Sequence, residues 1–205
     1  MGLASNEGLG AIGAVGNNHA MHNHRALLVA VLITALTAWG SIATAGAEGT
    51  NNAKALEVGD ALPSVPMNGL NGPDRVLASY VGRPLIINVW ASWCGPCRAE
   101  AASLERFAWS DAGKSYTVIG VSTDDYRTLA ERWLKQSNAT LSHFIDRKLV
   151  LENLLGAQHI PTTVLVDARG RVVARVQGAR EWDSAESSRL IEKAFSDFRR
   201  ARSKG

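Results

Sequence analysis

Both cysteines of this 205-residue chain lie in the stretch Trp90-Ala91-Ser92-Trp93-Cys94-Gly95-Pro96-Cys97. The apolar run that leads into it, residues 85–90 (LIINVW), is typical of a buried central strand. Residues 98–108, with their Ala, Glu and Leu, predict a helix directly after it. We therefore expect Cys94 at the N-terminus of a helix, where the helix dipole and unpaired N–H groups stabilise a thiolate.

Two cysteines in this spacing can close a small disulfide and open it again, which is the chemistry of thiol–disulfide exchange. We predict that Cys94 is the exposed nucleophile and that Arg98 slightly favours its thiolate. Cys97, one helical turn further along, is expected to be more buried and to resolve the mixed disulfide between Cys94 and a partner. Trp93 is expected to cover one side of this site.

The same pair of cysteines permits other interpretations. Structural zinc takes four ligands, and the body of the chain adds only His143 and His159, so we assign no metal site. Copper held by the two thiolates and a histidine stays an alternative. A purely structural bridge across so short a loop would add little stability.

Composition is that of an ordinary globular protein with one main domain. Hydrophobic residues make up 46% of the chain, and two cysteines exclude a disulfide-stapled scaffold. The formal net charge is +3, and four basic side chains lie in residues 199–205, a basic tail that is typically solvated. The rest of the chain is therefore near neutral, and we expect no binding of nucleic acid.

A segment without any charged residue, 26–47, predicts export from the cytoplasm. Its first part is strongly apolar, and its second part is rich in small residues with Ala-x-Ala cleavage options ending at Ala45 and Ala47. An uncleaved membrane anchor is the alternative, because about 20 apolar residues span a bilayer. Residues 1–25 are expected to be a disordered n-region or extension, with Met21 as an alternative start, and residues 48–54 a linker.

The remaining pattern predicts an alternation of strands and helices. Residues 124–136 should form an amphipathic helix with Leu129, Trp133 and Leu134 on one side, and Gly156 should end a helix over 149–155. The other expected elements are short strands and a hairpin in 55–84, strands at 116–122, 141–145, 160–167 and 171–177, and a helix at 184–201. This order indicates an α/β fold with helices on both faces of a sheet.

The cysteine motif, the strand before it and the Ile160-Pro161-Thr162-Thr163 element together resemble the thioredoxin superfamily. Within it, residues 55–198 are similar to the exported TlpA and ResA reductases and the cytochrome c maturation thioredoxins. The resemblance implies a central mixed sheet flanked by helices, with an N-terminal β extension and a central αβ insertion. It also implies that Pro161 is cis and faces the cysteines, in a substrate-docking groove shared with Trp93 and Ile160.

Three polar residues around the site match or depart from the family pattern. Asn88 takes the place of a buried aspartate in cytosolic thioredoxins and cannot titrate. Glu100 matches a glutamate that exported members use to handle protons for the cysteines, although a glutamate in the first turn of a helix is also favoured by the dipole alone. His159 departs from the small or apolar residue that the resemblance implies near Pro161, and is either a solvated loop residue or a residue that tunes the pKa of Cys94.

These observations lead to one functional hypothesis and its rivals. We predict an extracytoplasmic, periplasmic thiol:disulfide oxidoreductase without a cofactor, which reduces client disulfides such as those of apocytochrome c or copper-site proteins. An oxidising compartment then requires a membrane electron donor as a partner. The alternatives are a disulfide oxidase or isomerase, a copper metallochaperone that uses Cys94, Cys97 and His159, and a redox-inactive binding domain.

Overall fold

The computed structural model describes residues 54–204 of the chain. The predictions for residues 1–25, for the export segment 26–47 and for most of the linker 48–54 lie outside the described residues. Within residues 54–204, no helix is both long enough and apolar enough to cross a membrane.

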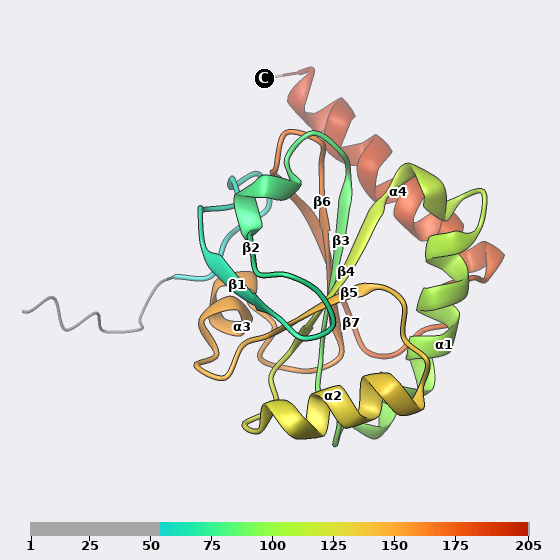
Figure 1. The fold of residues 1–205 in the computed structure, drawn as a ribbon. Helices are drawn as coiled ribbons and strands as arrows, with labels where there is room; N and C mark the ends of the chain where they lie inside the picture. The colour runs from blue at the N-terminus through green and yellow to red at the C-terminus, as the bar shows by residue number, and fades with distance from the viewer. Residues whose placement is uncertain (1–53, 205) are drawn as a thin grey trace, which may run out of the picture. The chain divides into compact units, whose positions relative to one another are not determined.

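A single mixed sheet of seven strands, in the order β2-β1-β5-β4-β3-β6-β7, forms the centre of the described part (Figure 1). The strands β3, β4 and β5 run parallel, whereas β6 pairs antiparallel with β3, and β7 with β6. The hairpin β1–β2 extends the opposite edge by antiparallel pairing with β5. The strands are β1 (Pro66–Gly69), β2 (Arg75–Val76), β3 (Leu85–Trp90), β4 (Thr117–Ser122), β5 (Ser142–Ile145), β6 (Thr162–Val166) and β7 (Val172–Gln177).

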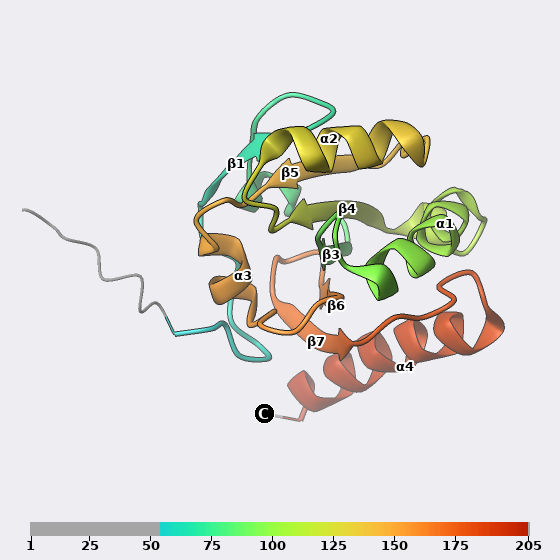
Figure 2. The same ribbon diagram turned by 90° about the horizontal axis from the view of Figure 1, so that it is seen from below.

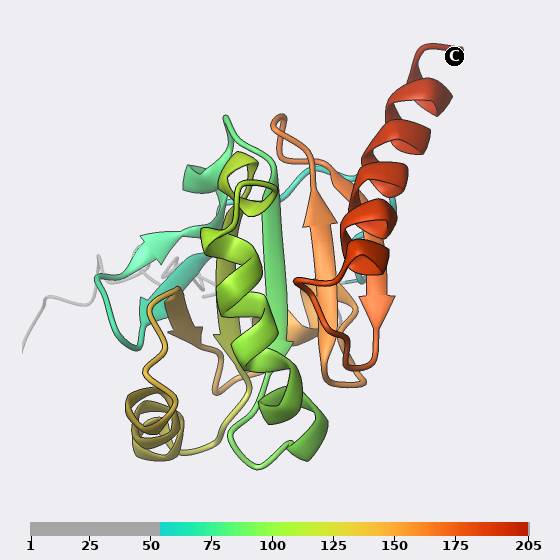
Figure 3. The same cartoon turned by 90° about the vertical axis from the view of Figure 1, so that its right-hand side faces the viewer.

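Within residues 54–204, four α-helices and two short 3-10 helices accompany this sheet. The helices α1, α2 and α4 cover one face, and α3 covers the other (Figure 2). Seen from the side of α1 and α4, both helices lie in front of the strands (Figure 3). The helices are α1 (Gly95–Trp109), α2 (Arg127–Gln136), α3 (Val150–Leu155), α4 (Ala185–Arg202), and the 3-10 helices Leu77–Tyr80 and Gly113–Ser115.

The central strand β3 is buried at every position, as expected for an apolar run with helices on both sides. Because side chains alternate along a strand, Ile86 faces the cluster formed with α1 and α4, whereas Ile87 faces the cluster formed with α3. A third cluster contains Trp90, both cysteines and the buried face of α2. The redox motif is therefore embedded in the core on the α1 side of the sheet.

The predicted thioredoxin-like architecture is confirmed, including the hairpin extension and the inserted α2–β5–α3 segment. Gly156 ends α3 in the left-handed conformation, with φ 64°, as its sequence position predicts. The assignment of Leu129 to the buried side of α2 is wrong, because that side chain is 40% exposed. Ala130 and Leu134, which are four residues apart, form the buried stripe instead.

The C-terminal helix α4 matches the predicted helix at 184–201 to within one residue at each end. It begins after Ser184, whose Oγ accepts a hydrogen bond from Ser187 N, and it continues to Arg202. The first residues of the predicted basic tail therefore form its last turn. Arginines at this end are favoured by the helix dipole, which explains why the helix continues through the first residues of the basic tail.

Candidate functional site

The connection between β3 and α1 is held in place by a buried carboxylate. Asp124 is fully buried at the end of β4. Its two oxygens accept hydrogen bonds from Ser92 N at 2.9 Å and Ser92 Oγ at 2.6 Å, and Ser122 Oγ donates to it at 2.7 Å. This network fixes the position of Ser92, two residues before Cys94. Sequence reasoning placed Asp124 only at the start of a helix, because nothing in the local pattern signals a bond across 32 residues.

The two cysteines form a disulfide at the start of α1, as the spacing predicts. Their sulfur atoms are 2.03 Å apart and their Cα atoms 5.3 Å apart. Cys94 is the N-cap residue of α1, and its Sγ accepts a hydrogen bond from Cys97 N at 3.2 Å. Pro96 lies in the first turn, where a missing N–H costs no helical hydrogen bond. The same N–H and the helix dipole are available to a thiolate on Cys94 after reduction.

The prediction that Cys94 is openly exposed is wrong for this oxidised state. Cys94 is 5% exposed and Cys97 3%, so burial scarcely distinguishes the two. The reason is packing: both cysteines belong to an apolar cluster with Trp90, Ala91 and residues of α2. The neighbouring Trp93, in contrast, is 68% exposed and offers an apolar surface at the mouth of the site.

A second loop, before β6, lies against the first cysteine. The Ile160–Pro161 peptide bond is cis, as the resemblance implies. Cys94 Sγ lies 3.9 Å from the carbonyl oxygen of Ile160, so this loop and the disulfide form one surface. His159, at the start of the loop, is exposed, and its carbonyl oxygen accepts a hydrogen bond from Thr162 Oγ1. The His159 backbone thus shapes the loop.

Glu100 is buried beneath the start of α1, with 1% of its surface exposed. Three groups donate hydrogen bonds to its carboxylate: Asn88 Nδ2 at 2.8 Å, Trp182 Nε1 at 3.0 Å and Arg180 N at 3.0 Å. Asn88 Nδ2 also donates to Thr163 Oγ1 at 3.0 Å, which connects this carboxylate to the strand that follows Pro161.

Burial raises the pKa of Glu100 above its ordinary value, because a carboxylate in a low-dielectric interior loses its hydration. The three hydrogen bonds act in the opposite direction and moderate the rise. The sequence indicated Glu100 through its spacing from Cys97, but it gave no signal for Trp182, which reaches the carboxylate from a loop 82 positions away. Glu100 is therefore a buried acid with a displaced pKa, held one turn along the same helix as Cys97.

Comparison with known proteins agrees with this geometry. The profile of the AhpC/TSA family matches residues 58–175. The thiol:disulfide interchange protein DsbE of Escherichia coli strain K12 is 28% identical over 164 residues, which cover 77% of this chain and 86% of that protein. The thiol-disulfide oxidoreductase ResA of Geobacillus thermodenitrificans is 26% identical over 124 residues, which cover 60% of this chain and 71% of that protein.

Among solved structures, one described as a DsbE thiol:disulfide interchange protein from Chlorobium tepidum superposes with a TM-score of 0.61 at 26% identity. The match covers 70% of this chain and 99% of that structure. Fold, disulfide and cis proline loop thus define a thioredoxin-like thiol:disulfide oxidoreductase. The chain belongs to the AhpC/TSA family, and its relatives carry the names DsbE and ResA.

Proposed function

We propose that this oxidoreductase works outside the cytoplasm as a reductase of specific protein disulfides, in which Cys94 attacks and Cys97 resolves. The observation that carries the roles is the position of the pair: Cys94 caps α1 against the Ile160–Pro161 loop, and Cys97 lies one turn inside the helix. The apolar segment 26–47 supports export, by cleavage or as an anchor.

The reaction balances as two exchange steps. The Cys94 thiolate attacks one sulfur of a client disulfide, and the other client sulfur leaves as a thiolate that takes up a proton. Cys97 then loses its proton and attacks Cys94 Sγ, which releases the second client thiol and closes the Cys94–Cys97 bridge. The client has gained two electrons, and a membrane dithiol donor must reduce the pair again.

We assign Glu100 the role of handling the proton of Cys97 during the second step. A carboxyl group with a raised pKa can hold a proton nearer neutrality than an exposed glutamate can. Asn88, which has no proton to exchange, holds the carboxylate in place from β3. Trp93, Ile160 and Pro161 form the surface for the client backbone, because they border Cys94 where a client sulfur must approach.

The apolar cluster around the pair supports the reducing direction. A strong oxidant of this superfamily owes its potential to a stabilised reduced form. The helix dipole and Cys97 N favour a thiolate on Cys94, whereas the apolar surroundings oppose it. This balance fits a pair that gives up its electrons readily. Clients with buried or metal-binding cysteines, such as apocytochrome c or copper-site proteins, fit this role.

The test is the reduction potential of the full-length protein at pH 7, measured by equilibration against a redox buffer. We expect a value near that of thioredoxin, about −270 mV, rather than near that of DsbA, about −120 mV. A value in the DsbA range would overturn the reductase assignment in favour of an oxidase. The Cys97→Ala variant is the control, because it must show no two-electron transition.

A further inference from the structure

The end of the sheet opposite the redox site has a cluster of basic side chains. The strand β3 begins at this end, directly after Pro84, and runs for six residues, about 20 Å, before Cys94 follows at the other end. Figure 3 shows the same separation, because α1 starts at one end of the sheet and α4 finishes at the other. The cluster, which we call the basic pole, comprises five exposed residues: Arg83, Arg169, Arg199, Arg202 and Lys204.

The positive charge of the basic pole is largely uncompensated. None of its five side chains forms an ion pair within residues 54–204, and the guanidinium of Arg83 donates only to two uncharged carbonyl oxygens. Of the two carboxylates that adjoin these segments, Asp197 already pairs with Lys193 and Arg200. Asp167 accepts hydrogen bonds from two backbone N–H groups of its own turn. A surface with this excess of cations attracts anions.

A hollow of about 460 Å³ lies within the basic pole. Its charged and aromatic lining residues are Asp167, Arg169, Phe195, Phe198, Arg199 and Arg202. The guanidinium carbon of Arg202 lies 5.8 Å from the centroid of the Phe198 ring. Nearby, Val81 is 50% exposed and adjoins the turn at Gly170, where a Cβ would lie 2.7 Å from Val81 Cγ2. The basic pole therefore combines cations with apolar surface.

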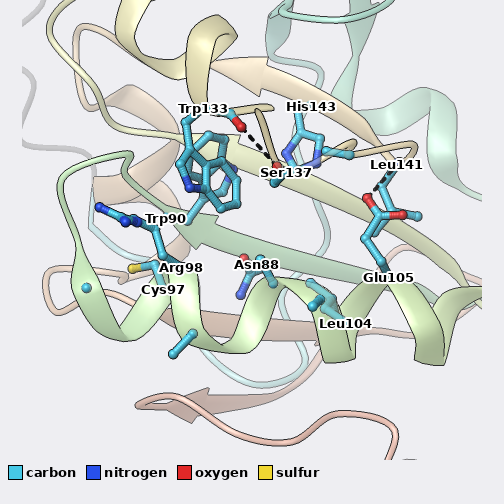
Figure 4. Close-up of a pocket in the computed structure, with 15 residues that line it drawn as sticks. Asn88, Trp90, Cys97, Arg98, Leu104, Glu105, Trp133, Ser137, Leu141 and His143 are labelled. Atoms are coloured by element: carbon cyan, nitrogen blue, oxygen red, sulfur yellow. Dashed lines mark hydrogen bonds between the residues drawn. The ribbon is translucent and has the colours of Figure 1, made fainter. Parts of the chain in front are cut away.

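The larger hollow beside the redox pair has a different character (Figure 4). It measures about 650 Å³, and Cys97 lines it together with aromatic and small side chains. Its charged residues are one cation, Arg98, and one carboxylate, Glu105, so it has no net preference for an anion. This hollow belongs to the redox site, whereas the basic pole lies outside the machinery of thiol–disulfide exchange.

The extent of the basic pole favours an anionic surface over a single small anion. Three of its arginines line the hollow, but Arg83 and Lys204 do not, so the positive charge extends beyond the space of one small ligand. An anionic bilayer offers a layer of phosphate groups above apolar chains. Such a layer complements cations that border apolar side chains.

The sequence places a bilayer within reach of the domain. Segment 26–47 is predicted to direct export or to stay as a membrane anchor, and residues 48–53 separate it from the described part of the chain. An extended linker of this length spans at most about 25 Å. In the anchored form the domain therefore stays next to the membrane, where each arginine near an anionic surface strengthens docking about fivefold.

We propose that the basic pole docks on the headgroups of an anionic phospholipid bilayer, with lipid phosphates at Arg169, Arg199 and Arg202. Because Cys94 lies beyond the other end of β3, the docked domain directs its redox site away from the bilayer and leaves it open to clients. The inference rests on the export assumed in the proposed function. It goes beyond thiol–disulfide exchange and is independent of the direction of electron flow.

The test is hydrogen–deuterium exchange of the full-length protein in nanodiscs of phosphatidylcholine, alone or mixed with phosphatidylglycerol. Both discs accommodate an apolar segment, so they differ in surface charge. We expect slower exchange of residues 165–171 and 198–204 when phosphatidylglycerol is present, and unchanged exchange of residues 123–130 beside the redox site. The difference should vanish at about 1 M salt, where the screening length is about 3 Å. Equal exchange of the basic pole in both discs would overturn the proposal.

Two triple variants with the same loss of charge locate the docking surface. The pole variant combines Arg169→Gln, Arg199→Gln and Arg202→Gln. The matched variant changes exposed cations of α2 and α4 that do not line the hollow, namely Arg132→Gln, Lys135→Gln and Arg189→Gln. The pole variant should weaken docking about a hundredfold and lose the protection, whereas the matched variant should keep it. Equal losses in both variants would refute the proposed surface, and exchange of the buried strand β3 checks that both are folded.

Two further arms separate this proposal from its rivals. A short DNA duplex is the competing extended polyanion, and protection of the basic pole by DNA but not by phosphatidylglycerol would refute lipid docking. The reduction potential tests the redox assignment and not the basic pole. Unprotected residues 198–204 together with a thioredoxin-like potential would therefore refute the docking surface alone, whereas protection together with a DsbA-like potential would refute the reductase alone.

Discussion

The close packing of β4 against β5 gives a sharp prediction at Gly120. Gly120 pairs with His143 across the two parallel strands. A Cβ at this position would lie 2.1 Å from His143 Nδ1 and 2.9 Å from Trp90 Nε1. Both rings are buried, so neither can swing into solvent to make room. The absence of a Cβ at residue 120 therefore lets the histidine and tryptophan rings lie over the strand.

Gly120→Ala should consequently destabilise the protein. Overpacking a core costs about 1–3 kcal/mol, and the stiffer unfolded chain of alanine offsets about 0.4–1 kcal/mol of it. We expect a net loss of about 1–2 kcal/mol in the free energy of unfolding, measured by urea denaturation of the oxidised full-length protein. Gly72→Ala is the matched control, because a Cβ there meets nothing within 4 Å.

A double-mutant cycle isolates the proposed cause. In a His143→Ala background only the milder contact with Trp90 Nε1 is left, so adding Gly120→Ala should cost much less, and the coupling free energy should be at least about 1 kcal/mol. If Gly120→Ala is as destabilising without the His143 ring as with it, the steric reasoning is refuted. The same holds if Gly120→Ala and Gly72→Ala have equal effects.

Three further predictions concern buried polar groups. Asp124→Ala should lower the free energy of unfolding by about 3 kcal/mol, measured in urea, because it removes the acceptor for Ser92 N, for the part-buried Ser92 hydroxyl and for the buried Ser122 hydroxyl. An effect below about 1 kcal/mol would contradict the network. Glu100 has a raised pKa, so the native state binds its proton more tightly than the unfolded state does. The free energy of unfolding should therefore fall as pH rises from about 4.3 through the native pKa. Glu100→Gln should remove this pH dependence, and a dependence that persists in the variant would refute the assignment to Glu100. His143 has a pKa lowered to about 4, so the unfolded state binds more protons than the native state. The free energy of unfolding should therefore fall as pH drops from about 6.5 toward 4. In thermal unfolding, His143→Gln should remove the pH dependence of stability in this range, and an unchanged dependence would contradict a buried neutral ring.

Most of the fold could be predicted from local sequence patterns. The run at 85–90 is apolar at nearly every position, and a strand covered on both sides has this composition. Gly156 and Ser184 lie at helix ends, where their backbone or side chain has a local physical role. The start of the solvated tail was harder to place than the end of the helix, because helical arginines and a solvated basic tail have the same composition.

The site was predictable where chemistry depends on spacing and not where it depends on contacts across the fold. Cys94, Cys97 and Glu100 lie on one helix, so their separation along the chain determines their separation in space. Asp124, Trp182 and His143 act through contacts with residues on other elements, and no local periodicity signals such contacts. The burial of Cys94 was also missed, because it comes from tertiary packing against α2 and the Ile160–Pro161 loop.

The central claim is that Cys94 attacks and Cys97 resolves, and trapping of mixed disulfides tests it most directly. Full-length Cys97→Ala, expressed in its native host, should accumulate disulfide-linked adducts of particular client proteins on Cys94. The matched variant Cys94→Ala should accumulate none, because Cys94, not Cys97, is the N-cap residue that lies against the Ile160–Pro161 loop. The proposed mechanism is contradicted if Cys97→Ala stays free of adducts although its Cys94 is reduced and reacts with an alkylating agent. It is also contradicted if Cys94→Ala is the variant that traps clients.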